Sequence, residues 1–584
     1  MTDFDSALKQ AQLSHHAGDL DAADRVYRQI LESDPQHAAA RYLSGLIALQ
    51  RGNLPAGIKA ISAAIAVDNT QPMYHHHLAE AYRAAGELVA PRECPRRALA
   101  QFQQSAELHD SLGQTLHELG ELPAARDEFE TAIRLRPDFA TAHFHMGVAL
   151  KAIGYFAEAS ERYRQALRIQ PNLAIAICGL AHALQQIGSL SEAATEYRRY
   201  LQIVPDDAMA RFNLGCVLQM LRRLDEATVE YDRSAAIAPP NADQLVQIGT
   251  CFQLLGKTAE AAERYRAAIA LDAQCNEAHL RLGTVLLASG DFEAGWPEYE
   301  WRLRPYARHR SLRVWDGSDL TGASIVVNAE GWQGLGDTLQ FVRYASFVRE
   351  RGAEVVLDVQ PPLVRLLKES GFPEVVSTGT SIHPPCDWQV AMMSLPRIFG
   401  TRLESIPAEV PYLFVRPEHI AAWNQTLQRR DDFKVGIHWH GSRNAVRDGR
   451  AIPLDAFEPL AHTPGVHLFS IQMGPEGSQL RRFANKSSVT DLASEIVDFY
   501  DSAAIMCSLD LVITSDSAPA HLAGALGRPV WVALPHSADW RWFTDREDSP
   551  WYSTMRLFRQ TRVDDWTELF SRIAAELTRL VENR

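Results

Sequence analysis

The stretch Leu509–Pro529, LDLVITSDSAPAHLAGALGRP, contains the signals of a buried strand, a polar turn and a short helix within 21 residues. The apolar run at Leu509–Ile513 indicates the strand, which gives way to the polar turn Thr514–Ser517. Ser517 can accept a backbone N–H bond as a helix cap, and Pro519 suits the first helical turn. Small residues then keep the helix slim enough to lie close to a sheet. We therefore expect a strand-to-helix junction of an α/β fold.

This junction predicts a ligand site. A helix that begins at the carboxyl end of a strand offers free backbone N–H groups and the positive end of its dipole. Phosphate groups bind in such places in α/β proteins. Asp516, Ser517 and His521 lie at the turn or one helical turn beyond it. The alternative, which the sequence leaves open, is a capped helix with a packed histidine.

Composition places the chain among ordinary globular proteins. Its 584 residues are 46% hydrophobic and 22% charged, and the net charge of −14 argues against a general nucleic-acid binder. We expect no secretory signal, because the N-terminus MTDFDSALKQ lacks an apolar core, and no transmembrane segment, because no apolar run approaches about 18 residues. The seven cysteines form no Cys-x-x-Cys pair, which favours a cytoplasmic location.

The N-terminal half repeats every 34 residues. Glycine occupies positions 18, 52, 86, 120, 154, 188, 256 and 290, and Arg222 takes the one missing place. An aromatic residue follows nine positions later in most copies, such as Tyr163 and Tyr197, and a small residue such as Gly147 precedes each loop by seven. The small residue lets two helices pack closely, the loop glycine turns the chain, and the aromatic fills the gap to the next copy.

This pattern resembles the tetratricopeptide repeat (TPR). We predict nine helix hairpins stacked into an α solenoid, with a domain at residues 1–304. Such solenoids present a groove, so we expect a protein partner. Histidines on first helices, among them His75–His77, leave open a metal site; we expect none, because adjacent histidines on a helix point in different directions.

A junction follows the repeats, and we place it at residues 305–322. The surrounding stretch Gly295–Gly322 is dense in aromatic residues, including Trp296, Tyr299 and Trp315, and it is not a flexible Gly/Ser linker. We expect these aromatics to fix the solenoid end to the next domain. Stacking on a nucleobase is the alternative role.

The C-terminal half alternates strand-like and helical runs, which predicts parallel sheets covered on both faces. We expect two Rossmann-like lobes with a cleft between them: a first, trimmed lobe at 323–415 on the acceptor side, and a second at 430–584 on the nucleotide-sugar side, ending in a helix. The polar stretch Trp423–Asp432 falls between them.

Two further loops carry candidate chemistry. The loop Glu330–Thr338 (EGWQGLGDT) is rich in glycine and places Asp337 at a helix start. Asp337 is either a plain N-cap or a general base held in the cleft. The loop His438–Arg450 (HWHGSRNAVRDGR) follows the first strand of the second lobe. It is either solvated or a clamp for a diphosphate, because guanidinium groups pair with phosphate oxygens.

Together these loops resemble the heptosyltransferase-like, family 9 glycosyltransferases of the two-lobed GT-B fold. The matching motifs are Gly336-Asp337-Thr338 and Ser515–Leu522, and the resemblance covers residues 321–584. It implies that Asp337 is the catalytic base and that Asp516, Ser517 and His521 contact the nucleotide sugar. The family's basic residue after the first strand of the second lobe corresponds to Arg443 or Arg450.

The candidate donor-binding set adds the glycine-loop residues, the start of the arginine loop and two residues of the loop His536–Trp542, which we expect to wall the cleft. These residues are Gly334, Gly336, Thr338, His440, Gly441, Arg443, Arg450, Asp516, Ser517, His521, Asp539 and Trp540.

The resemblance implies an inverting glycosyltransferase that moves a sugar from a nucleotide sugar to a hydroxyl of a protein held by the solenoid. No Asp-x-Asp occurs after residue 310, so we expect no essential metal and no cofactor. The layout is similar to bacterial solenoid–transferase proteins that modify flagellin, which makes flagellin a candidate acceptor. Two alternatives remain: a catalytically inactive interaction scaffold, and a glycolipid or lipopolysaccharide transferase.

Overall fold

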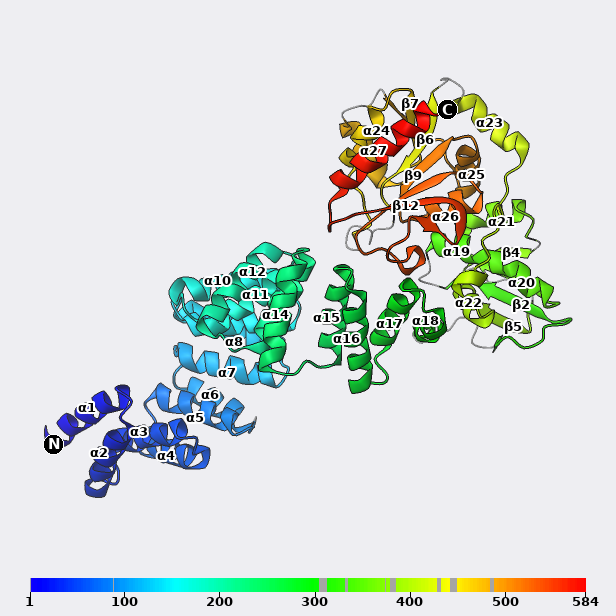
Figure 1. The fold of residues 1–584 in the computed structure, drawn as a ribbon. Helices are drawn as coiled ribbons and strands as arrows, with labels where there is room; N and C mark the ends of the chain where they lie inside the picture. Colours follow the sequence, from blue (N-terminus) through cyan, green and yellow to red (C-terminus); the bar gives the residue numbers. More distant parts are fainter. Residues whose placement is uncertain are drawn as a thin grey trace. The chain divides into compact units, whose positions relative to one another are not determined.

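A computed structural model describes residues 2–87, 89–303, 312–330, 334–372, 374–378, 385–427, 432–441, 449–483 and 488–584. The chain forms two compact units, Met1–Ala238 and Pro239–Arg584, which are described separately. The trace in Figure 1 runs from α1 at the N-terminus to α27 at the C-terminus. Across the described residues, no helix is both long and apolar enough to cross a membrane.

The first unit is a series of helix hairpins. The first helices of the hairpins are α1 (Thr2–His16), α3 (Ala38–Gln50), α5 (Pro72–Ala84), α7 (Ala106–Glu118), α9 (Ala140–Ala152), α11 (Ala174–Gln186) and α13 (Ala208–Met220). The second helices are α2 (Leu20–Ser33), α4 (Leu54–Val67), α6 (Val89–Leu99), α8 (Leu122–Leu135), α10 (Phe156–Ile169), α12 (Leu190–Ile203) and α14 (Leu224–Ile237).

The repeated residues play the packing roles that the sequence predicts. A Cβ atom on Gly147 would lie 2.6 Å from the ring of Tyr163, so only glycine allows the two helices to approach this closely. The Tyr163 side chain is fully buried. At the loop position Arg222 adopts a left-handed φ of 62°, the conformation that glycine supplies in the other copies.

The second unit begins with two more hairpins, α15 (Ala242–Leu254) with α16 (Thr258–Leu271), and α17 (Asn276–Ala288) with α18 (Phe292–Tyr299). The division between the units therefore falls inside the repeats, although the 34-residue period continues across it. The last hairpins belong to the same compact unit as the α/β half of the chain.

The first sheet has five parallel strands in the order β1-β5-β2-β3-β4. The strands are β1 (Arg313–Val314), β2 (Ser324–Asn328), β3 (Glu354–Val359), β4 (Glu374–Ser377) and β5 (Trp388–Ala391). The helices around it are α19 (Leu335–Phe341), α20 (Ala345–Glu350), α21 (Val364–Glu369) and α22 (Leu395–Ile398). β1 lies before residue 323, the predicted start of this lobe, and two residues are too few to show the alternating pattern of a strand.

The second sheet has seven strands in the order β11-β12-β10-β9-β6-β7-β8, all parallel except β11. The strands are β6 (Phe433–His438), β7 (Val466–Ser470), β8 (Val489–Asp491), β9 (Leu511–Ser515), β10 (Val530–Leu534), β11 (Asp548–Ser549) and β12 (Tyr552–Arg559). Its helices are α23 (Pro417–Leu427), α24 (Glu458–Ala461), α25 (Phe499–Cys507), α26 (Ala518–Ala525) and α27 (Trp566–Glu582). α24 and α27 share one apolar core on this sheet.

The order of strands in both sheets is that of a Rossmann-like fold. Counted along the chain, β8-β7-β6-β9-β10-β12 reads 3-2-1-4-5-6, and β4-β3-β2-β5 reads 3-2-1-4. The C-terminal half is thus built from α/β sheets of the class that the sequence predicts. The two-lobed GT-B arrangement stays a prediction.

The polar stretch Trp423–Asp432 falls between the last strand of the first sheet and the first strand of the second, as the sequence predicts. Its first residues belong to α23, which packs on α25 of the second sheet, and residues 428–431 lie outside the described residues. His419 of α23 stacks on Tyr500 at 4.8 Å and bonds Asp501 at 2.7 Å.

A single apolar core joins the last hairpin, the first sheet and helices of the second sheet. Trp296 and Tyr299 of α18 lie 5.4 and 5.7 Å from the ring of Trp540. Beside them the fully buried guanidinium of Arg302 pairs with Glu330, which follows β2, at 2.9 Å. Residues 304–311, most of the first half of the predicted junction, lie outside the described residues.

Candidate functional site

The predicted ligand loops lie where the order of strands reverses. In the second sheet this switch point lies between β6 and β9, and in the first sheet between β2 and β5. Ligands of open α/β sheets bind at the carboxyl ends of strands beside such a point. The loops that begin at His438, Asp516 and Ala329 follow β6, β9 and β2 respectively. The sheet topology therefore places all three predicted loops at ligand-binding positions.

Asp516 follows β9 and is only 6% exposed. Burial is the largest cause that raises its pKa to about 6; Asp539 raises it further, whereas Arg450 lowers it. Trp542 also lowers this pKa through its indole N–H, which faces the carboxylate. Neither Oδ2 of Asp516 nor Nε1 of Trp542 has a hydrogen bond of good geometry among the described residues, so the two groups are only loosely paired and a bound polar group could satisfy both.

Ser517 is the N-cap of α26, but the predicted cap bond is wrong: its side chain accepts no helix N–H bond. Its Oγ instead donates to Ser515 O at 3.1 Å and lies 3.3 Å from Nδ1 of His438. Burial and then His440 lower the pKa of His438 to about 3, so this imidazole is neutral at pH 7. Pro519 carries no N–H and the Ala520 N–H donates to Ser517 O at 3.0 Å, so Ala518 supplies the N–H of the first turn that a ligand could use.

His440 and Gly441 of the arginine loop lie at the same edge. The backbone N–H of His440 donates to Gln472 Oε1 at 2.9 Å, which anchors the start of the loop. A Cβ on Gly441 would be 3.4 Å from Ser517 Cβ, so this loop passes directly over the start of α26. Arg450 lies near enough to lower the pKa of both Asp516 and His521. Arg443 lies outside the described residues.

His521 connects the two sheets. Its ring stacks on Trp542 at 5.1 Å, and its Nδ1 lies 3.0 Å from the Tyr552 hydroxyl. A Cβ on Gly336, in α19, would lie 2.7 Å from His521 Cδ2. Burial lowers the pKa of His521 well below its usual value, and nearby arginines lower it further. His521 is therefore a neutral packing residue where α19 of one lobe meets α26 of the other.

Asp337 is the third residue of α19, and both of its oxygens are engaged. Oδ2 accepts the Gly334 N–H at 2.8 Å, and Oδ1 forms an ion pair with Arg541. Its side chain is 20% exposed. Asp337 is therefore not the N-cap that the sequence left as the alternative to a base: Gly334 holds that position, and Asp337, the third residue of the helix, bonds back to it. Thr338, next along the helix, is buried and donates to Gln360 Oε1 at 2.8 Å.

Arg541 organises the predicted wall loop. Its buried guanidinium pairs with Asp539 at 2.7 Å as well as with Asp337, and its Nε donates to Gln340 Oε1 at 2.7 Å. Trp540 is 3% exposed and packs among aromatic rings, including Trp296 and Phe341. This placement favours a packing role for Trp540 over a ligand contact. Asp539 stands closer to the ligand position, since it raises the pKa of Asp516.

Arg559 is a site residue that the sequence reasoning missed. It ends β12 in register with Leu534 of β10, so it lies at the same carboxyl edge as Asp516. Among the described residues it has no carboxylate partner; its Nη2 donates to the carbonyl oxygens of Trp542 and Phe543 at 3.1 and 2.8 Å. Burial lowers the pKa of this guanidinium, and Asp545 and Asp516 oppose that effect. A partly buried guanidinium that forms no direct ion pair among the described residues can still bind an anion.

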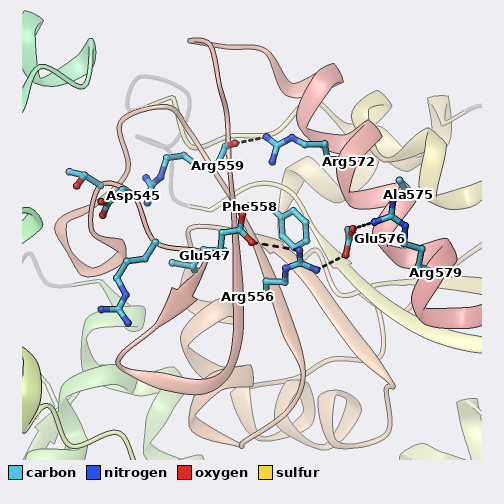
Figure 2. Close-up of a pocket in the computed structure, with 12 residues that line it drawn as sticks. Asp545, Glu547, Arg556, Phe558, Arg559, Arg572, Ala575, Glu576 and Arg579 are labelled. Carbon is cyan, nitrogen blue, oxygen red and sulfur yellow. Dashed lines mark hydrogen bonds and ion pairs between the residues drawn. The ribbon is translucent and has the colours of Figure 1, made fainter. Parts of the chain in front are cut away.

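Arg559 also lines a cavity of about 390 Å³ between β12 and α27. Figure 2 shows its side chain directed toward Asp545, away from Glu576, which pairs with both Arg556 and Arg579. Arg556 and Arg579 are thus held in direct ion pairs, whereas Arg559 is only near the carboxylates of Asp545 and Asp516. No motif marks Arg559, because the missed strand β12 resembles an exposed alternating segment; only its pairing with β10 reveals the position.

Family comparison identifies the helical half. Models described as "TPR repeat" and "Tetratricopeptide repeat" match residues 113–154, 140–173, 8–72, 178–243 and 255–300. The helical half consists of tetratricopeptide repeats. Protein FlbA of Caulobacter vibrioides is 29% identical over 325 residues, which are 50% of this chain and 54% of FlbA. This chain therefore spans about half of that relative's length.

Solved structures with similar helical repeats include YrrB, titled a TPR protein with an unusual peptide-binding site. It is 22% identical, covers 32% of this chain and 95% of its own, and has a TM-score of 0.30. A Pseudomonas aeruginosa pilF structure is 19% identical over 35% of this chain and 94% of its own, with a TM-score of 0.33. A structure of the APC/C hetero-tetramer Cut9–Hcn1 is 14% identical, covers 48% of this chain and 55% of its own, and has a TM-score of 0.37.

Proposed function

We propose that the α/β half is a glycosyltransferase that takes a sugar from a nucleotide sugar and transfers it, with inversion, to a hydroxyl of a protein bound by the TPR repeats. One observation carries the proposal: Asp516 and the start of α26 lie at the switch point of a Rossmann-like sheet, and Arg559, at the same edge on β12, is near enough for Asp516 to raise its pKa. A buried carboxylate, a guanidinium and the start of a helix at this edge suit a sugar linked to a diphosphate.

The cations and the helix would hold the phosphates. Arg559 supplies a guanidinium that forms no direct ion pair among the described residues, and Arg450 is near enough to Asp516 to lower its pKa. The start of α26, with the N–H of Ala518, adds the positive end of a helix dipole. These groups would stabilise the charge that develops on the departing phosphate, so the proposal requires no metal ion.

The acceptor hydroxyl must lose a proton as it attacks the anomeric carbon. The family resemblance assigns this role to Asp337, but its ion pair with Arg541 and its bond to Gly334 engage both of its oxygens in this geometry. Asp337 becomes a base only if the acceptor displaces Arg541. Asp516, with a pKa of about 6 and one oxygen without a hydrogen bond of good geometry, has the properties of a group that binds a donor hydroxyl or accepts a proton.

The repeats would supply the acceptor. Solenoids of this type present an extended concave surface, and the last two hairpins share a compact unit with the α/β half. Flagellin remains a candidate acceptor, on the similarity of layout alone. A cytoplasmic location would fit a protein acceptor modified before export.

A catalytically inactive scaffold is the second candidate. The engaged state of Asp337 favours it, because a carboxylate held by an arginine and a backbone N–H serves packing without any chemistry. In that case the repeats would bind their partner, and the α/β half would contribute a rigid platform.

The experiment is thermal unfolding of the full chain with CMP-, UDP-, GDP- and ADP-linked sugars. All twelve tryptophans lie after residue 238, so their fluorescence reports the second unit alone. A donor at about 100-fold its dissociation constant adds roughly 2.7 kcal/mol to the unit that binds it. We expect one nucleotide class to raise the melting temperature, and Arg559→Gln to reduce that shift.

Arg579→Gln is the matched control, because Arg579 lines the same cavity but is paired with Glu576. It should keep the full shift. If none of the donors raises the melting temperature, the scaffold becomes the better account.

A further inference from the structure

A cluster outside the α/β half brings together three metal-ligating side chains. His76, His77 and Glu80 all lie on α5, and one ligand atom from each is within 4.8 Å of the others. Nε2 of His76 is 3.6 Å from Glu80 Oε1, and Nε2 of His77 is 4.0 Å from Glu80 Oε2. The sequence favoured no metal here because adjacent histidines diverge on a helix. The structure shows that Glu80, one turn later, reaches both.

Each histidine is held by its other ring nitrogen. Nδ1 of His77 lies 3.1 Å from Met73 O, a pure acceptor, and 2.6 Å from the Tyr42 hydroxyl on α3. Nδ1 of His76 lies 2.5 Å from Ser111 Oγ on α7. An Nδ1–H that donates to protein oxygens leaves Nε2 as the lone-pair atom in the neutral ring. Metal-binding histidines are oriented in this way.

The three lone-pair atoms therefore converge on one point. Two imidazole nitrogens that face a carboxylate all act as acceptors, and only a proton or a cation between them makes the arrangement attractive. Ligand atoms about 2 Å from a tetrahedral zinc ion are roughly 3.3 Å apart, so small rotations of Glu80 would close the site. The side chains are 12%, 25% and 44% exposed, which lets an ion enter from solvent.

We propose that His76 Nε2, His77 Nε2 and Glu80 bind a zinc-type transition-metal ion on α5, with water or a partner group in the fourth position. Two nitrogens and one carboxylate are a donor set that suits Zn²⁺. The two histidines are held by Tyr42 of α3 and Ser111 of α7, so a bound ion would stabilise the packing of three neighbouring hairpins. The inference is independent of the proposed transferase activity.

The same histidine run provides a matched control. His75 directly precedes the pair, but its Nδ1 faces Cys94 Sγ at 3.9 Å and its ring approaches Phe102 at 6.2 Å. Its side chain therefore points toward α6 and takes no part in the cluster. Replacing His75 removes one imidazole from the chain without touching the site.

The experiment titrates Zn²⁺ into tag-free full-length protein that has been stripped with chelator, by calorimetry. We expect one site that is weakened at least about 10-fold in His76→Ala, in His77→Ala and in Glu80→Gln, and retained in His75→Ala. The absorption spectrum of Co²⁺ in the same site should show the intense visible bands of tetrahedral coordination in wild type and in His75→Ala only.

Unfolding of each variant in chelator separates lost binding from lost folding. His77→Ala removes a contact with Tyr42 and could lower the stability of the repeats. If it unfolds at a lower temperature than wild type, the zinc affinity of Glu80→Gln, whose side chain is exposed, is the test of the site. The proposal is overturned if wild type binds no zinc, or if Glu80→Gln and His75→Ala bind it equally well.

Discussion

The two strand-to-helix junctions of the α/β half have the same place in their sheets but opposite states of their aspartates. Asp337 follows β2 and Asp516 follows β9, each beside the switch point of a sheet with Rossmann-like strand order. Asp337 has both oxygens engaged by Gly334 and Arg541. Asp516 is more deeply buried and has one oxygen without a hydrogen bond of good geometry.

This difference distinguishes a residue that serves the fold from one that serves a ligand. A carboxylate paired with an arginine and a helix-start N–H stabilises the structure around it. A buried carboxylate with an unmet oxygen costs stability, and such a cost is expected where a ligand will complete the site. We therefore infer that Asp516 binds the ligand and that Asp337 holds the structure around it in place.

The largest effect should come from Arg541→Ala. This change leaves Asp337 and Asp539 without their shared cation, so we expect the free energy of unfolding of the second unit to fall by about 3–5 kcal/mol. Urea unfolding followed by tryptophan fluorescence measures it. Arg572→Ala breaks a surface pair and should cost less than about 1 kcal/mol. Equal costs for the two variants would show that the Arg541 network is not structural.

Asp516→Asn should change how stability depends on pH. The folded pKa of about 6 lies above the reference of 3.8, so the proton stabilises the folded state below pH 3.8 and that stabilisation is lost as the pH rises through 6. Asparagine never ionises. We expect the stability of the variant relative to wild type to rise by up to about 3 kcal/mol between pH 4 and pH 8. If the difference in unfolding free energy between the variant and wild type stays constant with pH, the pKa of Asp516 is not raised in the folded state.

Asp337→Asn is the comparison for that experiment. Because Arg541 would lose a charged partner, we expect this variant to be less stable than wild type at pH 8. Opposite signs for the two substitutions at the same pH would support the division of roles.

A smaller effect is expected for Gly336→Ala. The new Cβ would lie 2.7 Å from His521, which is held between Trp542 and Tyr552, so we expect a loss of about 1–3 kcal/mol. Gly334→Ala meets nothing closer than 3.3 Å and should cost less than about 1 kcal/mol. If Gly336→Ala is tolerated as well as Gly334→Ala, the contact between α19 and α26 is looser than described.

Local patterns predicted much of this fold. The 34-residue period gave the hairpins, and apolar runs gave β2, β3 and β4 with their observed bounds. The motif at Asp516 correctly indicated a strand end and a helix start. These features succeed because period, turn chemistry and capping act over a few residues.

What the sequence did not predict depends on partners far along the chain. Arg541 meets Asp337 across 204 residues, and this pairing decides whether Asp337 is free to act as a base. Arg559 becomes a site residue only because β12 pairs with β10. The 34-residue repeat does not indicate that the chain divides at Pro239. The repeat reports how each hairpin forms, whereas the division reflects how the hairpins pack on one another.

The central claim is that Asp516, and not Asp337, is the carboxylate that faces the ligand. The most direct measurement is the dissociation constant of the nucleotide sugar that best stabilises the wild-type chain, determined for wild type, Asp516→Asn and Asp337→Asn. The account predicts at least a 10-fold loss of affinity, about 1.4 kcal/mol, for Asp516→Asn and a much smaller change for Asp337→Asn. A loss confined to Asp337→Asn would contradict it.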